Sequence, residues 1–294
     1  MIIKGIDLTF ELESRRGTSI VTGITIPKLN EGETCPVVIM LDGYMGNRNG
    51  QGLFYGGIGE NLGIGEQICD LGIASVRLDF PGCGDSKESF AAYTVDNMLS
   101  DVEVVYHHIL ENYPIDPGRI GMCCWSNGGR IAALFAEKHQ EIRTMVLWAP
   151  VAANGSAMWP HVVAALNPRF EEIGLTEDEY YLQLRETAER DGVAEIPWFD
   201  GSEKTACLSS EFFDGNDNAK PLDALKKFKG DVLMVVAGKD TCVPRYVFQE
   251  IINNTEINWV TIDEADHDFG SETKNNRIIK TVQDVTASYL YRKL

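Results

Sequence analysis

Short, uninterrupted apolar segments recur along this sequence, with helical periodicity between them. Apolar runs of roughly four to eight residues are typical of strands that are buried on both faces. Such runs occur at 36–41, 74–80, 119–124, 144–149, 231–237 and 258–262. Strands that alternate with helices are joined by crossovers, so the pattern predicts a mostly parallel sheet with helices on both faces.

The segments between these runs carry apolar residues at spacings of three and four, which predicts amphipathic helices. The clearest spans 98–110, and Thr94 or Asp96 is placed to cap it. Similar patterns cover 131–135 and 278–290. The chain is therefore predicted to belong to the α/β class.

The start of the chain has a different pattern. Ile6–Leu12 and Ser19–Ile26 are rich in Ile, Val and Thr and predict a β-hairpin around Ser14–Gly17. With this hairpin the sheet has about eight strands, and 144–149 is the sixth of them.

The alternation stops between residues 153 and 219. No clear buried strand is visible there, and Trp and Phe residues are scattered among acidic ones. Within it, Glu177–Arg190 has the composition of an acidic surface helix. We interpret 153–219 as an insertion that covers the sheet as a lid, with 1–152 and 220–294 forming the core. Ordinary surface helices without any contact to substrate are the alternative.

The net charge of the chain indicates which kinds of binding partner are unsuitable. The formal net charge is −18, from 44 acidic and 26 basic residues. Such a surface repels phosphate backbones and anionic lipid, so neither nucleic acid nor a membrane is expected as a partner. Met1–Arg16 lacks the apolar core of a signal peptide, which favours a cytoplasmic location.

The number and spacing of cysteines and histidines indicate whether disulfides or a metal site are expected. Seven cysteines without an export signal favour reduced thiols over a disulfide framework. The five histidines form no motif with metal-ligand spacing, so no metal is expected.

Ser126 is the first candidate for chemistry. It lies where strand 119–124 ends and a helix begins, a turn that can push a serine hydroxyl out of the sheet. Such a turn needs small neighbours, and Gly128 and Gly129 supply them on one side. On the other side Cys124 stands where the G-x-S-x-G motif has glycine. The motif taken alone is therefore weak.

Order and spacing strengthen the case for Ser126. A serine needs a base to remove its proton and a third group to orient that base. Asp240 follows strand 231–237 and His267 follows strand 258–262. Asp240 alone could be a turn former and His267 alone a surface imidazole. The order Ser, Asp, His at the carboxyl ends of three strands predicts a catalytic triad.

Acyl transfer also needs donors for the oxyanion. The candidates are the backbone N–H of Asn127, directly after Ser126, and that of Tyr44, in the loop after strand 36–41. Trp125, Trp159 and Trp198 are candidates for substrate contact.

These motifs resemble the α/β-hydrolase superfamily. The resemblance rests on five segments: 42–47 (DGYMGN), 77–86 (RLDFPGCGDS), the turn at Ser126, 238–244 and 266–269 (DHDF). It is greatest to the cinnamoyl/feruloyl-esterase and dienelactone-hydrolase-like branches. It implies ester hydrolysis through an acyl-enzyme without a cofactor. Asp42 departs from the family pattern, which usually has histidine there.

The sequence predicts a serine esterase acting on a small-molecule ester, with aryl or cinnamoyl-type esters as candidates. Acyltransferase, thioesterase, peptidase and C–C hydrolase activities remain open because they share the same triad. The alternative without enzymatic activity is a protein with the hydrolase fold that binds a ligand but does not catalyse a reaction. A homo-oligomer is also open.

Overall fold

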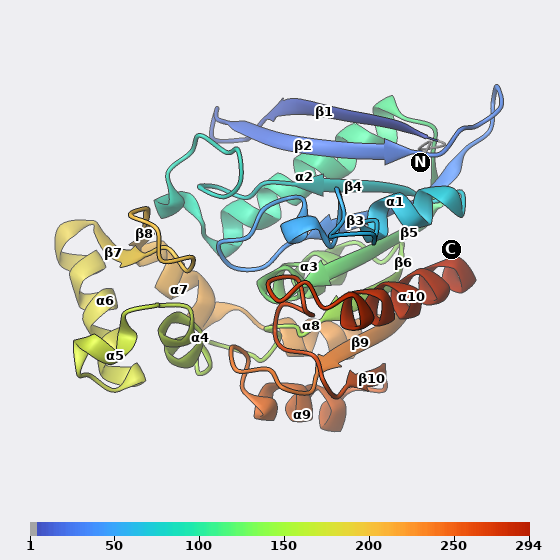
Figure 1. Cartoon of the computed structure of the whole chain (residues 1–294). Coiled ribbons are helices and arrows are strands. Elements are labelled where there is room, and N and C mark those ends of the chain that lie inside the picture. The colour runs from blue at the N-terminus through green and yellow to red at the C-terminus, as the bar shows by residue number, and fades with distance from the viewer. Residues whose placement is uncertain (1–4) are drawn as a thin grey trace.

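The computed structural model describes residues 5–294 (Figure 1), and residues 1–4 of the predicted N-terminal segment lie outside that range. An eight-stranded sheet forms the centre, in the order β1-β2-β4-β3-β5-β6-β9-β10. Its strands are β1 (Ile6–Glu13), β2 (Ser19–Ile26), β3 (Cys35–Leu41), β4 (Ala74–Leu78), β5 (Ile115–Trp125), β6 (Ile142–Trp148), β9 (Asp231–Ala237) and β10 (Asn258–Ile262). The pairs β1–β2 and β2–β4 are antiparallel and the others are parallel. The predicted fold class is confirmed.

Helices cover both faces of this sheet (Figure 1). The core helices are α1 (Ile64–Asp70), α2 (Val95–Asn112), α3 (Asn127–Lys138), α8 (Pro221–Lys227), α9 (Arg245–Asn254) and α10 (Asn276–Lys293), with two short 3-10 turns, η1 (Gly50–Gly52) and η2 (Phe90–Ala92). Helix α3 packs against α2 and α8, whereas α1 packs against α10. Within residues 5–294, no helix combines the length and apolar character needed to cross a membrane.

Helix α2 illustrates how sequence sets these elements. The Thr94 hydroxyl accepts a hydrogen bond from the backbone N–H of Asn97 at 3.3 Å, which caps the helix as predicted. Its buried face includes Met98, Val102 and Ile109. Burial of this apolar face stabilises the helix more than intrinsic propensity does.

The segment between β6 and β9 holds the predicted insertion. It contains α4 (Trp159–Ala165), α5 (Phe170–Ile173), α6 (Glu177–Asp191), β7 (Val193–Pro197), β8 (Thr205–Ser209) and α7 (Ser210–Asn218). The expectation of an acidic helix is met by α6, which Thr176 and Glu179 cap reciprocally.

The insertion also contains two partly buried strands, which the search for continuous apolar runs did not predict. Strands β7 and β8 pair antiparallel in a separate two-stranded sheet. Each is short and mixes buried with more exposed residues, so neither shows the continuous apolar run typical of the core strands.

Arg130 attaches the insertion to the core. This buried side chain on α3 donates hydrogen bonds to the carbonyl oxygens of Ala153, Gly155 and Asn216, each at 2.9 Å. Burial lowers the pKa of its guanidinium to about 10. One side chain therefore holds both the start and the end of the insertion.

Candidate active site

Ser126 occupies a sharp turn between β5 and α3. Its backbone has φ 54° and ψ −119°, a conformation that L-residues rarely adopt. The serine N–H donates to the Trp148 carbonyl at 2.8 Å, and its carbonyl accepts from Val151 N–H at 3.0 Å. Strand β6 and the residues after it therefore hold the strained turn in place.

The neighbours of Ser126 pack as closely as the sequence predicts. A Cβ atom at Gly128 would lie 2.1 Å from the Leu41 carbonyl oxygen, and one at Gly129 would lie 2.8 Å from Cβ of Pro150. Cys124, in the position usually held by glycine, is fully buried, with Sγ 3.9 Å from the Ile39 carbonyl oxygen. Burial raises the pKa of its thiol well above the usual range, so Cys124 is a packing residue.

The structure brings the three predicted triad side chains together. His267 Nε2 lies 3.1 Å from Ser126 Oγ, and His267 Nδ1 lies 2.9 Å from Asp240 Oδ2. The other carboxylate oxygen of Asp240 accepts backbone N–H groups of Cys242 and Val243 at 2.9 and 2.8 Å. These bonds fix the Asp240 carboxylate, which in turn orients the imidazole.

The electrostatic surroundings of His267 favour its protonated form. Burial lowers its pKa, but the charge and hydrogen bond of Asp240, together with Asp268 and Asp42, raise it, and the net shift is upward. The His267 carbonyl accepts a hydrogen bond from the Trp125 indole at 3.0 Å. The imidazole is thus held by its partners and by its own backbone.

Asp240, Cys242 and His267 also place possible metal ligands within 4.8 Å of one another. Burial, with Asp240 and Asp268, raises the pKa of the Cys242 thiol to about 12, which disfavours the thiolate that binds metals. The hydrogen bond between His267 and Asp240 accounts for this cluster without an ion.

The two predicted oxyanion donors belong to residues near Ser126, since Tyr44 lines the same pocket and Asn127 is its neighbour in the chain. Asn127 follows it at the start of α3, and Tyr44 lies in the loop after β3. Neither backbone N–H has an acceptor within residues 5–294. Both are therefore available to a ligand.

Asp42 shapes the loop that carries Tyr44. Its two carboxylate oxygens accept the N–H groups of Gly43 at 2.7 Å and Asn47 at 2.8 Å. Burial raises the pKa of Asp42 to about 7. Asp42 stands where the family usually has histidine, and no pattern in the sequence indicates that its carboxylate holds this loop.

A pocket of about 70 Å³ opens onto the triad. Its lining comes from four parts of the chain: Asp42, Gly43, Tyr44, Gly46 and Gln51; Trp125 and Ser126; Leu166 and Phe199; Cys242, His267, Asp268, Ser271 and Glu272. Leu166 and Phe199 belong to the insertion, so this segment reaches the site.

The three tryptophans predicted to contact substrate differ in position. Trp125 lines the pocket, whereas Trp159 and Trp198 do not. Trp159 is 0% exposed and packs on Tyr44 and Phe212. Trp198 is 6% exposed and packs on Phe90.

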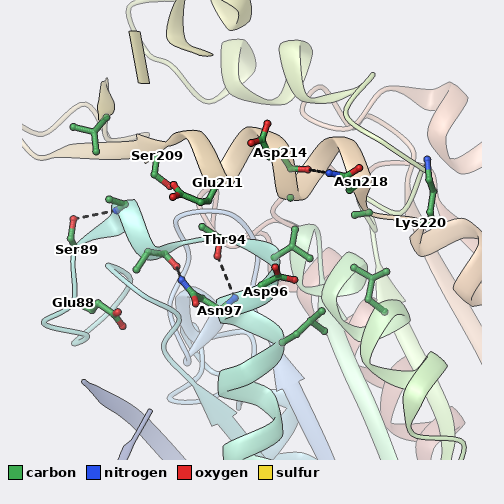
Figure 2. A pocket seen from close by; sticks show the side chains of 18 of the residues that line it. Glu88, Ser89, Thr94, Asp96, Asn97, Ser209, Glu211, Asp214, Asn218 and Lys220 are labelled. Atoms are coloured by element: carbon green, nitrogen blue, oxygen red, sulfur yellow. Dashed lines mark hydrogen bonds between the residues drawn. The ribbon is translucent and has the colours of Figure 1, made fainter. Parts of the chain in front are cut away.

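A larger groove of about 990 Å³ lies away from the triad, between α7 and the start of α2. Figure 2 shows Thr94, Asp96 and Asn97 on one side and Glu211 and Asp214 on the other. None of the triad residues lines it.

Comparison with solved structures shows the fold. Ferulic acid-bound Est1E from Butyrivibrio proteoclasticus has a TM-score of 0.69 and 18% identity, covering 97% of this chain and 98% of that one. An esterase from Exiguobacterium antarcticum has a TM-score of 0.64 and 15% identity, covering 96% and 99%. An acylaminoacyl peptidase from Pyrococcus horikoshii has a TM-score of 0.65 and 14% identity, covering 99% of this chain and 42% of that one.

Comparison with curated proteins gives no match. A family model described as serine aminopeptidase, S33, matches residues 57–274, well over half of the chain. The match spans Ser126, Asp240 and His267. Together with the eight-stranded sheet, it shows that the chain belongs to this family of α/β-hydrolases.

Proposed function

We propose that this protein is a serine hydrolase that cleaves carboxylic esters through an acyl-enzyme. The observation that carries this proposal is the chain of hydrogen bonds from Ser126 through His267 to Asp240. A base bonded to a serine hydroxyl, and oriented by a buried carboxylate, is the arrangement that makes serine nucleophilic.

The reaction then has two halves. Ser126 Oγ attacks the ester carbonyl while its proton moves to His267 Nε2, which passes it to the departing alkoxide. Water next attacks the acyl-enzyme, gives a proton to His267, and the acid leaves as Ser126 regains its hydrogen. Asp240 stays ionised and stabilises the imidazolium in both halves.

The oxyanion of each tetrahedral intermediate is assigned to the N–H groups of Tyr44 and Asn127. Neither has a protein acceptor among residues 5–294, so both can donate without breaking a bond described there. The bonds from Asp42 to the Gly43 and Asn47 N–H groups support the loop in this role.

The insertion is proposed to act as the lid of this site. Leu166 and Phe199 line the pocket beside Ser126, and its volume of about 70 Å³ suits a small acyl or alcohol group. Aryl and cinnamoyl-type esters are the larger candidates, since Est1E is similar to this chain in fold and binds ferulic acid.

Amide hydrolysis is the second candidate, because the matching family is described as a serine aminopeptidase. The same triad and oxyanion donors serve both reactions. Matched aryl esters and anilides of the same acids separate them, since only a peptidase cleaves the anilides at a comparable rate.

A fluorophosphonate probe tests the proposal directly. We expect labelling of the wild type, none of Ser126→Ala, and normal labelling of Ser271→Ala, a second serine that lines the same pocket. A correctly folded wild type that resists the probe would overturn the enzymatic role. An ester panel of increasing acyl size, with Ser126→Ala as the blank, then defines what the insertion selects.

A further inference from the structure

Apart from His267, the ionisable acidic and basic side chains that line the Ser126 pocket all carry carboxyl groups. Asp42, Asp268 and Glu272 contribute carboxyl groups. Among the described residues, no lysine or arginine lines it, and His267 is its only basic side chain. A ligand entering this pocket therefore meets a negative field that its low-dielectric walls strengthen.

Two of these carboxylates are not neutralised. Within residues 5–294, the carboxylates of Asp268 and Glu272 accept no hydrogen bond and form no ion pair. The carboxylates of Asp240 and Asp42, in contrast, each accept hydrogen bonds from backbone N–H groups. Burial and the neighbouring Glu272 and Asp266 raise the pKa of Asp268 to about 6. An added cation would relieve this repulsion.

A buried hydroxyl at the same wall also lacks a partner. Ser271 is 7% exposed, lines the pocket, and its Oγ has no hydrogen-bond partner among the described residues. Its backbone N–H donates to the Asp268 carbonyl at 3.1 Å, so the two residues lie on one turn. Buried polar groups are seldom left unpaired, and such an atom in a pocket points to a ligand.

The remaining walls are aromatic. Tyr44, Trp125 and Phe199 line the pocket together with the carboxylates. Trp125 is held beside the base, with its ring centroid 6.0 Å from that of His267. Aromatic faces combined with nearby carboxylates attract alkylammonium and quaternary ammonium groups.

We propose that the pocket selects esters whose leaving alcohol carries a protonated amine or a quaternary ammonium group. This inference rests on the proposed ester hydrolysis. The cation is assigned to the alcohol because His267 gives its proton to the leaving oxygen, and Asp268, Ser271 and Glu272 follow His267 in the same loop. The proposed oxyanion donors come from elsewhere, Tyr44 from the loop after β3 and Asn127 from the start of α3.

An isosteric substrate pair tests the proposal. The pair is acetylcholine and its uncharged analogue, in which a carbon atom replaces the nitrogen. Intrinsic reactivity differs between the two esters, so the measured quantity is the ratio of their kcat/KM values in each protein. We expect this ratio to fall by about tenfold or more in Asp268→Asn/Glu272→Gln relative to the wild type.

Glu111→Gln/Glu256→Gln is the matched control, because it removes the same charge from two exposed side chains near the amino ends of β5 and β10. Its ratio should equal that of the wild type. Added tetramethylammonium should competitively inhibit hydrolysis of a neutral ester by the wild type and inhibit the pocket variant at least about tenfold more weakly. If the double variant does not fold, the same ratio is measured in Glu272→Gln alone, which changes an exposed residue.

The outcomes separate the two proposals. Equal ratios in the wild type and the pocket variant, with both active on the neutral ester, would overturn cation selection and leave ester hydrolysis standing. If the wild type hydrolyses neither ester and resists the fluorophosphonate, the proposed hydrolysis itself fails.

Discussion

Gly43 faces the candidate nucleophile so closely that no side chain fits between them. A Cβ atom at Gly43 would lie 2.9 Å from Cβ of Ser126 and 3.3 Å from its Oγ. The backbone of Gly43 does not have a positive φ, so conformational freedom is not what requires glycine there. The requirement is steric, and it brings the loop that carries Tyr44 against Ser126.

Gly43→Ala should therefore inactivate the enzyme without unfolding it. The added methyl group displaces either the serine or the loop, and loss of one oxyanion donor lowers kcat by about 100-fold or more. The measurement is kcat on a neutral aryl ester. Gly215→Ala on α7 is the control, since its Cβ would lie no closer than 3.5 Å to Val95. Wild-type kcat in Gly43→Ala would contradict this account of the loop.

The pH dependence of kcat/KM should report the acidic surroundings of His267. Activity needs the neutral imidazole, and Asp240, Asp268 and Asp42 raise its pKa above the usual 6.5, against the opposing effect of burial. On the acid side of the profile, the midpoint of the rise in kcat/KM (the acid limb) should therefore lie above pH 6.5. In Asp268→Asn one anion no longer favours the imidazolium, so the limb should move to lower pH.

Glu256→Gln, an exposed change near the amino end of β10, is the control for that profile and should leave the limb in place. A limb that stays fixed in Asp268→Asn would show that this carboxylate does not act on His267.

The candidate triad was predictable because each member is defined locally. Ser126, Asp240 and His267 each follow a strand, and the carboxyl ends of neighbouring parallel strands meet at one edge of the sheet. The triad could therefore be predicted from the order of the three residues, without knowing how distant parts of the chain pack. Cys124 weakened the serine motif, yet the structure accommodates its side chain beside Ile39.

The insertion was less predictable because its packing is not local. Trp159 and Trp198 have the composition of ligand-binding residues, but both are buried among aromatic side chains from other parts of the chain. The ring of Tyr44 joins one of these clusters although only its backbone was assigned a role. No periodicity within residues 153–219 indicates which core residue each tryptophan meets.

Arg130→Met should destabilise the protein through the insertion. The substitution leaves the Ala153, Gly155 and Asn216 carbonyl groups without their donor, at a cost of about 3 kcal/mol in the free energy of unfolding. Urea denaturation measures this loss. Arg190→Met removes an exposed guanidinium whose one ion-pair partner in the described part of the chain is Asp191, and it should cost far less. Equal losses in the two variants would mean that Arg130 does not hold the insertion.

Tyr44 connects the insertion to the proposed oxyanion hole. Its ring packs edge-to-face on Trp159 at 5.5 Å and on Tyr93 of the core at 5.6 Å. The same residue lines the pocket with Ser126 and carries a backbone N–H proposed as an oxyanion donor. We therefore expect Trp159 to act as a positioning residue that holds the Tyr44 ring and, through it, the N–H group.

Trp159→Ala should accordingly lower kcat by about tenfold or more while leaving KM nearly unchanged, since a displaced donor weakens only the transition state. Trp198→Ala is the matched control, because Trp198 is also buried in the insertion but packs on Phe90 and Phe199. Either truncation costs about 3–5 kcal/mol of stability, so both are assayed well below their unfolding midpoints. Trp159→Phe, which keeps an aromatic contact with Tyr44, should recover most of kcat. Equal losses of kcat in the two alanine variants would attribute the effect to general destabilisation and not to the Tyr44 contact.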